Sequence, residues 1–76
     1  MNPTDRERIF CENVKILREQ HHLSKREMAR RMGIGLTTLN ELEAGRLPRR
    51  LKAGAFLRLM DLSGLTGEEL LSPILK

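Results

Sequence analysis

Apolar residues recur along this 76-residue chain at helical spacing, and no stretch alternates apolar and polar positions as a strand does. The pattern predicts five helices: about residues 5–21, a short helix between Ser24 and Gly33, a third between Gly35 and Gly45, a fourth over 52–64 and a last one over 67–71. The residues expected to face inward are Ile9, Phe10, Val14, Leu17, Met28, Ala29, Met32, Leu39, Leu42, Phe56, Leu59, Met60 and Leu62. The prediction is an all-α single domain over residues 1–76, with a core of about 5–71 and a short tail over 72–76.

The ends of these predicted helices carry their own signals. Reciprocal capping boxes are predicted for three pairs, Thr4 with Glu7, Ser24 with Glu27 and Thr66 with Glu69. His22 falls where a left-handed residue usually ends a helix, and Gly33 and Gly45 end the next two. Pro73 should stop the last helix.

The second and third predicted helices are separated by so few residues that they must meet at a sharp corner. The second helix leaves outside four charged residues, Lys25, Arg26, Arg30 and Arg31, whereas the third leaves outside Thr37, Asn40, Glu41 and Ala44. This division is expected of a helix-turn-helix, in which phosphate contacts position the protein and a second helix reads base edges in the major groove. Gly33 allows the turn, and Ile34 can fill the angle between the helices.

Positive charge gathers around the same corner. The chain carries a net charge of +4, but residues 25–52 hold eight basic and three acidic side chains, against six basic and seven acidic elsewhere. Such a patch indicates either an anionic partner or a solvated face that keeps the protein soluble.

Composition excludes several other classes of function. Two Phe and no Trp or Tyr speak against RNA or single-strand readers, which stack bases on aromatic side chains. Cys11 has no helping base, His21 and His22 have no ligands at metal spacing, and Gly33–Gly35 lacks the strand and Gly-Lys-Ser/Thr of a phosphate loop. We therefore expect no enzyme, cofactor or metal. With no apolar signal core and no membrane span, a cytoplasmic protein is expected.

Two long stretches resemble a known family. The segments "FCENVKILREQHHLSKREMARRMGIGLTTLNELEAG" and "FLRLMDLSGLTGEELL" are similar to the phage repressor and Cro-type helix-turn-helix family, also called the XRE family, over about residues 10–71. The resemblance implies a five-helix, lambda-repressor-like globule with a DNA-binding unit formed by helices 2 and 3. It also implies dimers on palindromic operators.

The resemblance assigns roles by position. Lys25 sits where a phosphate contact falls, Leu36, Thr37 and Glu41 sit at base-reading positions, and Thr38 and Asn40 flank them. Arg18 and Glu43 occupy positions that form a buried ion pair between helices 1 and 3.

This chain departs from the family pattern in two ways. The base-reading positions carry no Arg, Lys or Gln, so the strongest guanine contact is missing. The loop over 47–51 is longer than usual and basic, which predicts further phosphate contacts. The full set of expected phosphate contacts is Lys25, Arg26, Arg46, Arg49 and Arg50.

The sequence thus predicts a double-stranded DNA-binding regulator, most simply a repressor. The apolar residues expected to close either the core or a homodimer interface are Leu70, Leu71, Ile74 and Leu75. A protein-interaction module of the same fold, antitoxin-like or an adaptor, is the alternative, because Glu41 would repel phosphates unless it accepts a hydrogen bond from a cytosine.

Overall fold

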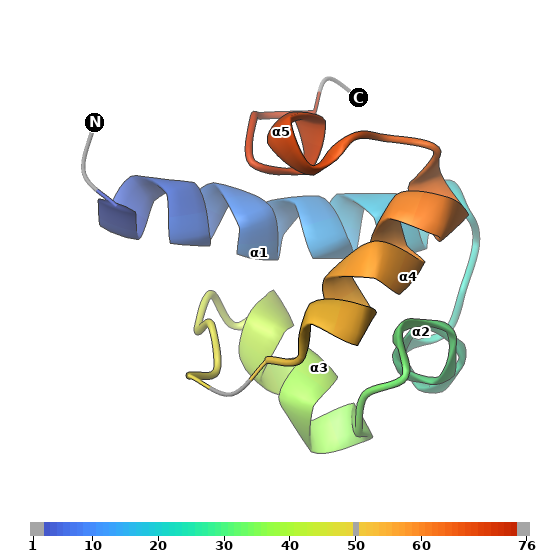
Figure 1. The fold of residues 1–76 in the computed structure, drawn as a ribbon. Helices are drawn as coiled ribbons and strands as arrows, with labels where there is room; N and C mark the ends of the chain where they lie inside the picture. Colours follow the sequence, from blue (N-terminus) through green and yellow to red (C-terminus); the bar gives the residue numbers. More distant parts are fainter. Residues whose placement is uncertain (1–2, 50, 75–76) are drawn as a thin grey trace.

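The computed structural model describes residues 3–49 and 51–74, with side chains from residue 5 onward. Within this part of the chain five helices follow one another, and no strand occurs. They are α1 (Pro3–Gln20), α2 (Lys25–Met32), α3 (Leu36–Glu43), α4 (Ala53–Ser63) and α5 (Gly67–Leu70) (Figure 1). The predicted all-α class and the five helices are confirmed.

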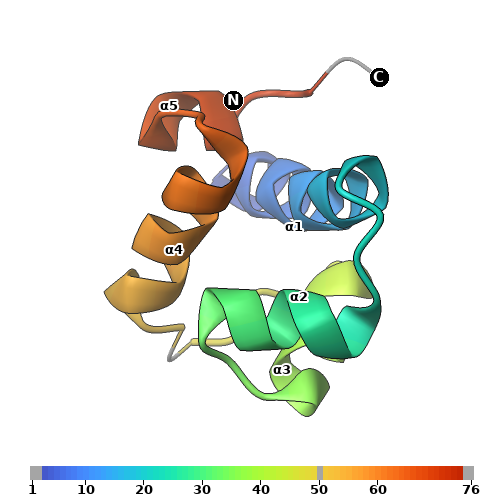
Figure 2. The ribbon, with the colours of Figure 1, turned by 90° about the vertical axis from the view of Figure 1, so that its right-hand side faces the viewer.

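The long α1 lies between the pair α2 and α3 on one side and the short α5 on the other. α4 runs from the side of α2 and α3 toward α5 (Figures 1 and 2). α2 packs against both α3 and α4, and α3 packs against α1. The corner between α2 and α3 therefore rests on α1 and α4, with its outer side left open.

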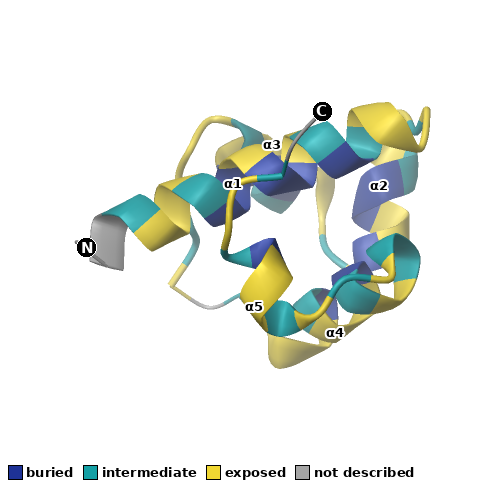
Figure 3. Ribbon diagram, turned by 90° about the horizontal axis from the view of Figure 1, so that it is seen from above, coloured by how far each residue is buried: buried dark blue, intermediate teal, exposed yellow. Residues whose placement is uncertain are grey.

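The core lies where α1 to α4 meet (Figure 3). Most predicted inward residues belong to it, and those buried are Phe10, Val14, Leu17, Met28, Ala29, Met32, Leu39, Leu42 and Leu59. Phe56, Met60 and Leu62 are half-buried and pack against its edge. Ile9 was predicted wrongly: it is half-buried and outside the core, because it lies roughly 100° around the helix from Phe10 on the side opposite to the buried Cys11.

Backbone hydrogen bonds close the first three helices as predicted. His22 has a φ of 55°, and the N–H of Leu23 donates to the carbonyl of Arg18 at 3.0 Å. Gly33 and Gly45 adopt φ values of 72° and 87° at the ends of α2 and α3. These left-handed residues satisfy carbonyls that a helix end otherwise leaves unpaired.

The three predicted capping boxes have different outcomes. Thr66 and Glu69 form a complete box, with both side chain to backbone hydrogen bonds present. The Ser24 box is only half formed: its hydroxyl accepts from the N–H of Glu27, but the Glu27 carboxylate turns to the arginines one turn further along α2. The Thr4 side chain lies outside the described residues.

Asn13 is a buried polar residue that the apolar pattern did not reveal. Its side chain is 1% exposed, and its Nδ2 donates to the carbonyls of Leu70 at 2.7 Å and of Ser72 at 2.8 Å. The Leu70 carbonyl lies at the end of α5, where the last carbonyls of a helix have no partner within it, and the Ser72 carbonyl lies just after the helix. One amide of α1 therefore holds the carboxyl-terminal segment in place, and Leu70 fills the core beside it.

We expect Asn13→Ala to lower the free energy of unfolding by about 1–3 kcal/mol, because the buried Leu70 carbonyl and the partly buried Ser72 carbonyl lose their donor. Asn13→Asp should lower it further, since a carboxylate would face the same two oxygens. Urea denaturation of both variants measures the effect, with the exposed Gln20→Ala as the control on the same helix. An Asn13→Ala change below about 0.5 kcal/mol would contradict this role.

Candidate nucleic-acid interface

The turn between α2 and α3 depends on Gly33 for two reasons. Its φ of 72° is a left-handed conformation, and its N–H donates to the carbonyl of Arg30 at 3.1 Å. A Cβ built there would also come within 3.2 Å of Nε of Arg58, whose side chain crosses the turn from α4. Ile34 follows, half-buried against the core as expected. The left-handed conformation of Gly33 therefore sets the direction in which α3 leaves the turn.

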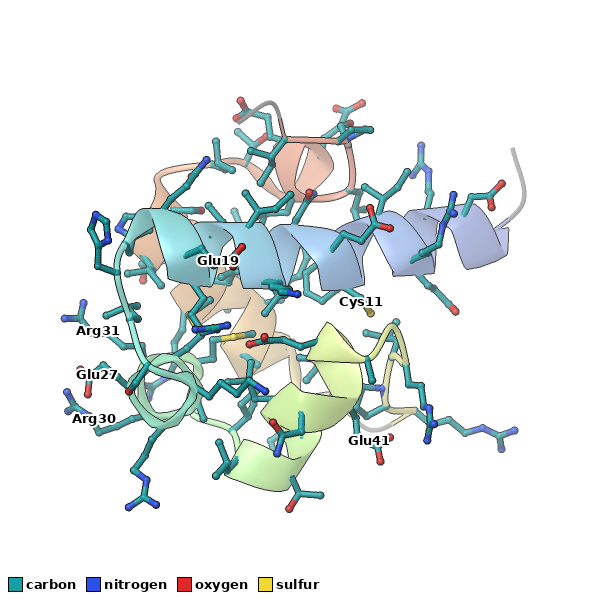
Figure 4. The ribbon with its side chains drawn as sticks, turned by 180° about the vertical axis from the view of Figure 1, so that it is seen from behind. Cys11, Glu19, Glu27, Arg30, Arg31 and Glu41 are labelled. Atoms are coloured by element: carbon teal, nitrogen blue, oxygen red, sulfur yellow. The ribbon has the colours of Figure 1, made fainter. Side chains whose placement is uncertain are left out.

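The outer face of α3 consists of short polar side chains. Leu39 and Leu42 are fully buried, which turns Thr37, Asn40 and Glu41 to solvent. The Glu41 carboxylate points away from the rest of the molecule (Figure 4). At the start of the helix Leu36 is 40% exposed, a large apolar side chain facing water. The resemblance assigned base reading to Leu36, Thr37 and Glu41, with Asn40 beside them.

Thr38 differs from the other residues predicted to contact bases. Its side chain is half-buried, whereas those of Leu36, Thr37, Asn40 and Glu41 are exposed. It therefore lies at the border between the core side and the outer face of α3.

Cations predicted to contact phosphates lie on the elements that precede and follow α3. Lys25 and Arg26 are exposed in the first turn of α2, and Arg46 and Arg49 are exposed in the loop after α3. None of these four forms an ion pair with a described residue. Arg50 lies outside the described residues.

A hollow beside α3 brings residues of three helices together. Its volume is about 630 Å³, and its lining includes Lys25 from α2, Asn40 from α3 and Lys15 from α1. Lys15 was missed in the sequence analysis. Its place one turn before Arg18 on α1 was the available signal, because residues three apart lie on the same side of a helix. Two lysines thus stand next to a residue expected to read bases.

The arginines in the last turn of α2 differ from the cations of its first turn because they have a partner. Arg30 and Arg31 both donate to the Glu27 carboxylate, Arg30 through two nitrogens and Arg31 through Nε at 3.4 Å (Figure 4). The hydrogen bond from Arg30, followed by that from Arg31, holds the pKa of Glu27 below its usual value. Glu27 therefore stays ionised and offsets part of the positive charge expected from this face of α2.

An ion pair fixes α3 to α1. Arg18 donates through Nε to Oε2 of Glu43 at 2.8 Å and through Nη2 to Oε1 at 3.1 Å, and its Nη1 donates to the carbonyl of Leu23 at 3.0 Å. The two side chains are 16% and 6% exposed. This two-pronged geometry is the pair that the family resemblance predicted, and it also holds the connection between α1 and α2.

Because the pair is largely buried, we expect Glu43→Ala to lower the free energy of unfolding by about 3–5 kcal/mol, leaving the Arg18 guanidinium unpaired. Glu27→Ala breaks an exposed pair and is the matched control, with a much smaller change expected. Chemical denaturation compares the two. A loss below about 1 kcal/mol for Glu43→Ala would contradict this expectation, because exposed ion pairs contribute no more than that.

Other chemistry has little support in the described part of the chain. No group of three or more His, Cys, Asp or Glu residues there is arranged to hold a metal ion. Cys11 is 1% exposed and points from α1 toward α3, and burial, with a smaller effect of Glu7 and Glu12, raises the pKa of its thiol (Figure 4). A protonated, buried thiol is a poor nucleophile. No described helix has the length and apolarity needed to cross a membrane.

Comparison with known proteins gives one match. A family model described as "Helix-turn-helix domain" matches residues 11–72, which include α2, the turn and α3. No curated protein and no solved structure matches the chain. The matched description covers helix-turn-helix domains in general, so the finer resemblance to the phage repressor and Cro type stays a prediction.

Proposed function

The chain belongs to the helix-turn-helix domain family, and we propose that it is a transcriptional regulator that binds double-stranded DNA in a sequence-specific manner. The observation that carries the proposal is the outer face of α3. It presents short hydrogen-bonding side chains on a helix held at a defined angle, with unpaired cations on the elements before and after it. A helix of this kind fits the major groove, where base edges differ in their donors and acceptors.

Each side chain of α3 that was predicted to contact bases has a chemical counterpart among them. Asn40 can pair with an adenine through two hydrogen bonds, and Glu41 can accept from a cytosine amino group. Leu36 and the methyl groups of Thr37 and Thr38 can contact a thymine methyl. The residues proposed to supply phosphate contacts, which hold the protein on the duplex whatever the base sequence, are Lys25, Arg26, Arg46, Arg49 and Arg50.

We propose further that the protein represses transcription as a homodimer on a palindromic operator, in the cytoplasm. A single unit of this size reaches few base pairs, and two units related by a two-fold axis would read half-sites about 34–36 Å apart. Since Leu70 is used by the core, the described apolar side chains left for an interface at this end are the half-buried Leu71 and Ile74. Leu75, also predicted there, lies outside the described residues.

A protein-interaction module of the same fold is the second candidate, and the exposed Glu41 favours it. A carboxylate on the outer face of α3 repels phosphates unless it is paired with a base. Selection from a random duplex pool, followed by gel shifts at low and at moderate salt, separates the two functions. An enriched palindrome supports the regulator, and absence of binding even at low salt supports the interaction module.

If phosphate contacts and base contacts are made by different residues, variants of the two kinds should affect DNA binding differently. Arg49→Ala should weaken binding to all duplexes alike and reduce the slope of log K against log salt by about 0.9 for the lost phosphate contact. Asn40→Ala should leave that slope unchanged and lower discrimination at one base pair by about 1–3 kcal/mol. Fluorescence anisotropy titrations on the selected site and on a scrambled duplex measure both. Identical behaviour of the two variants would contradict the division.

Glu41→Gln tests the carboxylate on the outer face of α3. The loss of a negative charge beside the groove should raise affinity for non-specific duplexes, while preference for cytosine at one position should fall. Repeating the selection with this variant reads out both effects. If the selected motif is unchanged in both the Glu41 and the Asn40 variants, α3 is not the reading helix.

A further inference from the structure

A small apolar hollow lies outside the DNA-reading face. It has a volume of about 310 Å³ and is lined by the amino-terminal half of α1, the loop between α3 and α4, the start of α4 and Leu71. Phe10 and Phe56 line it, with ring centroids 5.6 Å apart, together with Leu47 and Leu51 of the loop. Ligand sites of small molecules are typically apolar hollows of roughly 300 Å³ or more with a few polar groups at fixed places.

The rim of this hollow is positively charged. Arg6 of α1, Arg49 of the loop and Lys52 before α4 all line it and are exposed, and Glu7 is the one acidic residue among its lining. The three cations form no ion pair with any described residue. Lys52 is also the N-cap of α4 and makes no side-chain cap hydrogen bond, so the positive end of that helix adds to the field.

We propose that the hollow binds a small amphipathic carboxylate, whose apolar body lies against Phe10, Phe56 and the two loop leucines while its anionic group meets Arg49 and Lys52. The charge of the rim selects the occupant: an apolar cation would be repelled, and an uncharged molecule would gain nothing from the rim. The area available is small for a stable protein partner, which usually buries about 800 Å² on each side.

Occupation of this site bears on DNA binding through Arg49. The same guanidinium is expected to contact a phosphate, so a bound carboxylate would neutralise it and hold the loop against α1. The ligand then lowers affinity for every duplex rather than for one sequence. This regulatory part rests on the proposed function, whereas ligand binding itself does not.

Octanoate is the probe for direct binding, measured by isothermal titration calorimetry in the absence of DNA. Two molecules with the same chain length are the controls, 1-octanol without charge and octylamine with a positive charge. We expect octanoate to bind about tenfold or more tightly than 1-octanol, and octylamine to bind least. Equal affinity for octanoate and 1-octanol, or no binding of octanoate, would overturn the proposal.

Two arginines of the same loop provide a matched pair of variants. Arg49 lines the hollow and Arg46 does not. Arg49→Gln should weaken octanoate about tenfold and leave 1-octanol unchanged, whereas Arg46→Gln should leave both unchanged. Ala53→Phe, which places a ring at the exposed edge of the hollow, should abolish binding of both molecules. Equal effects of the two arginine variants would overturn the site, because they would indicate general charge attraction.

The regulatory part is tested by DNA titrations with octanoate, using sodium acetate at the same concentration as the ionic control. Octanoate should lower the affinity of the unaltered protein for a scrambled duplex and leave the affinity of Ala53→Phe unchanged. If octanoate binds but the protein binds no duplex, the proposed function fails alone. If duplexes bind but octanoate does not, this inference fails alone. A dimer in sedimentation that octanoate dissociates would assign the hollow to a second copy and overturn the proposal.

Discussion

The position of the helix-turn-helix unit depends on one guanidinium. Arg18 binds the Glu43 carboxylate at the end of α3 and the carbonyl of Leu23 before α2, so a single side chain of α1 holds both α3 and the connection that leads into α2. Hydrophobic burial holds the same helices together but is non-directional, and it would allow α3 to rotate or slide. A two-pronged hydrogen bond has a defined geometry, and it fixes the end of α3 on α1.

Carboxylates also decide which cations are available. Glu43 pairs with Arg18 at the edge of the core, and Glu27 pairs with Arg30 and Arg31 on the outer side of α2. Among the described cations predicted to contact phosphates, none has a described ion-pair partner, and they lie in the first turn of α2 and in the loop after α3. From net charge alone, all four basic residues of α2 would be expected to attract an anion. The pairing moves the available charge toward both ends of α3, where a DNA backbone would pass.

Much of the fold was predictable because helices are local. Spacing of three and four residues identified the buried faces of α2 and α3, and the left-handed residues His22, Gly33 and Gly45 marked helix ends. Asn13 and Arg58 were not found, because each contacts a segment distant in the sequence. Asn13 binds carbonyls more than fifty positions away, and Arg58 crosses a turn made by another helix. The half-formed Ser24 cap failed for a different reason, since Glu27 had a stronger competing partner in Arg30.

The sequence by itself determined the helices, the sharp corner between the second and the third, and the short polar side chains on the outer face of α3. Each of these features follows from residue types within a few positions of one another. Only the tertiary structure decided which charges are free, how Asn13 closes the carboxyl-terminal segment, and that Phe10, Phe56 and the loop leucines enclose a hollow with a basic rim. Those features join residues of several helices. Their distances are set by packing, which periodicity along one helix does not encode.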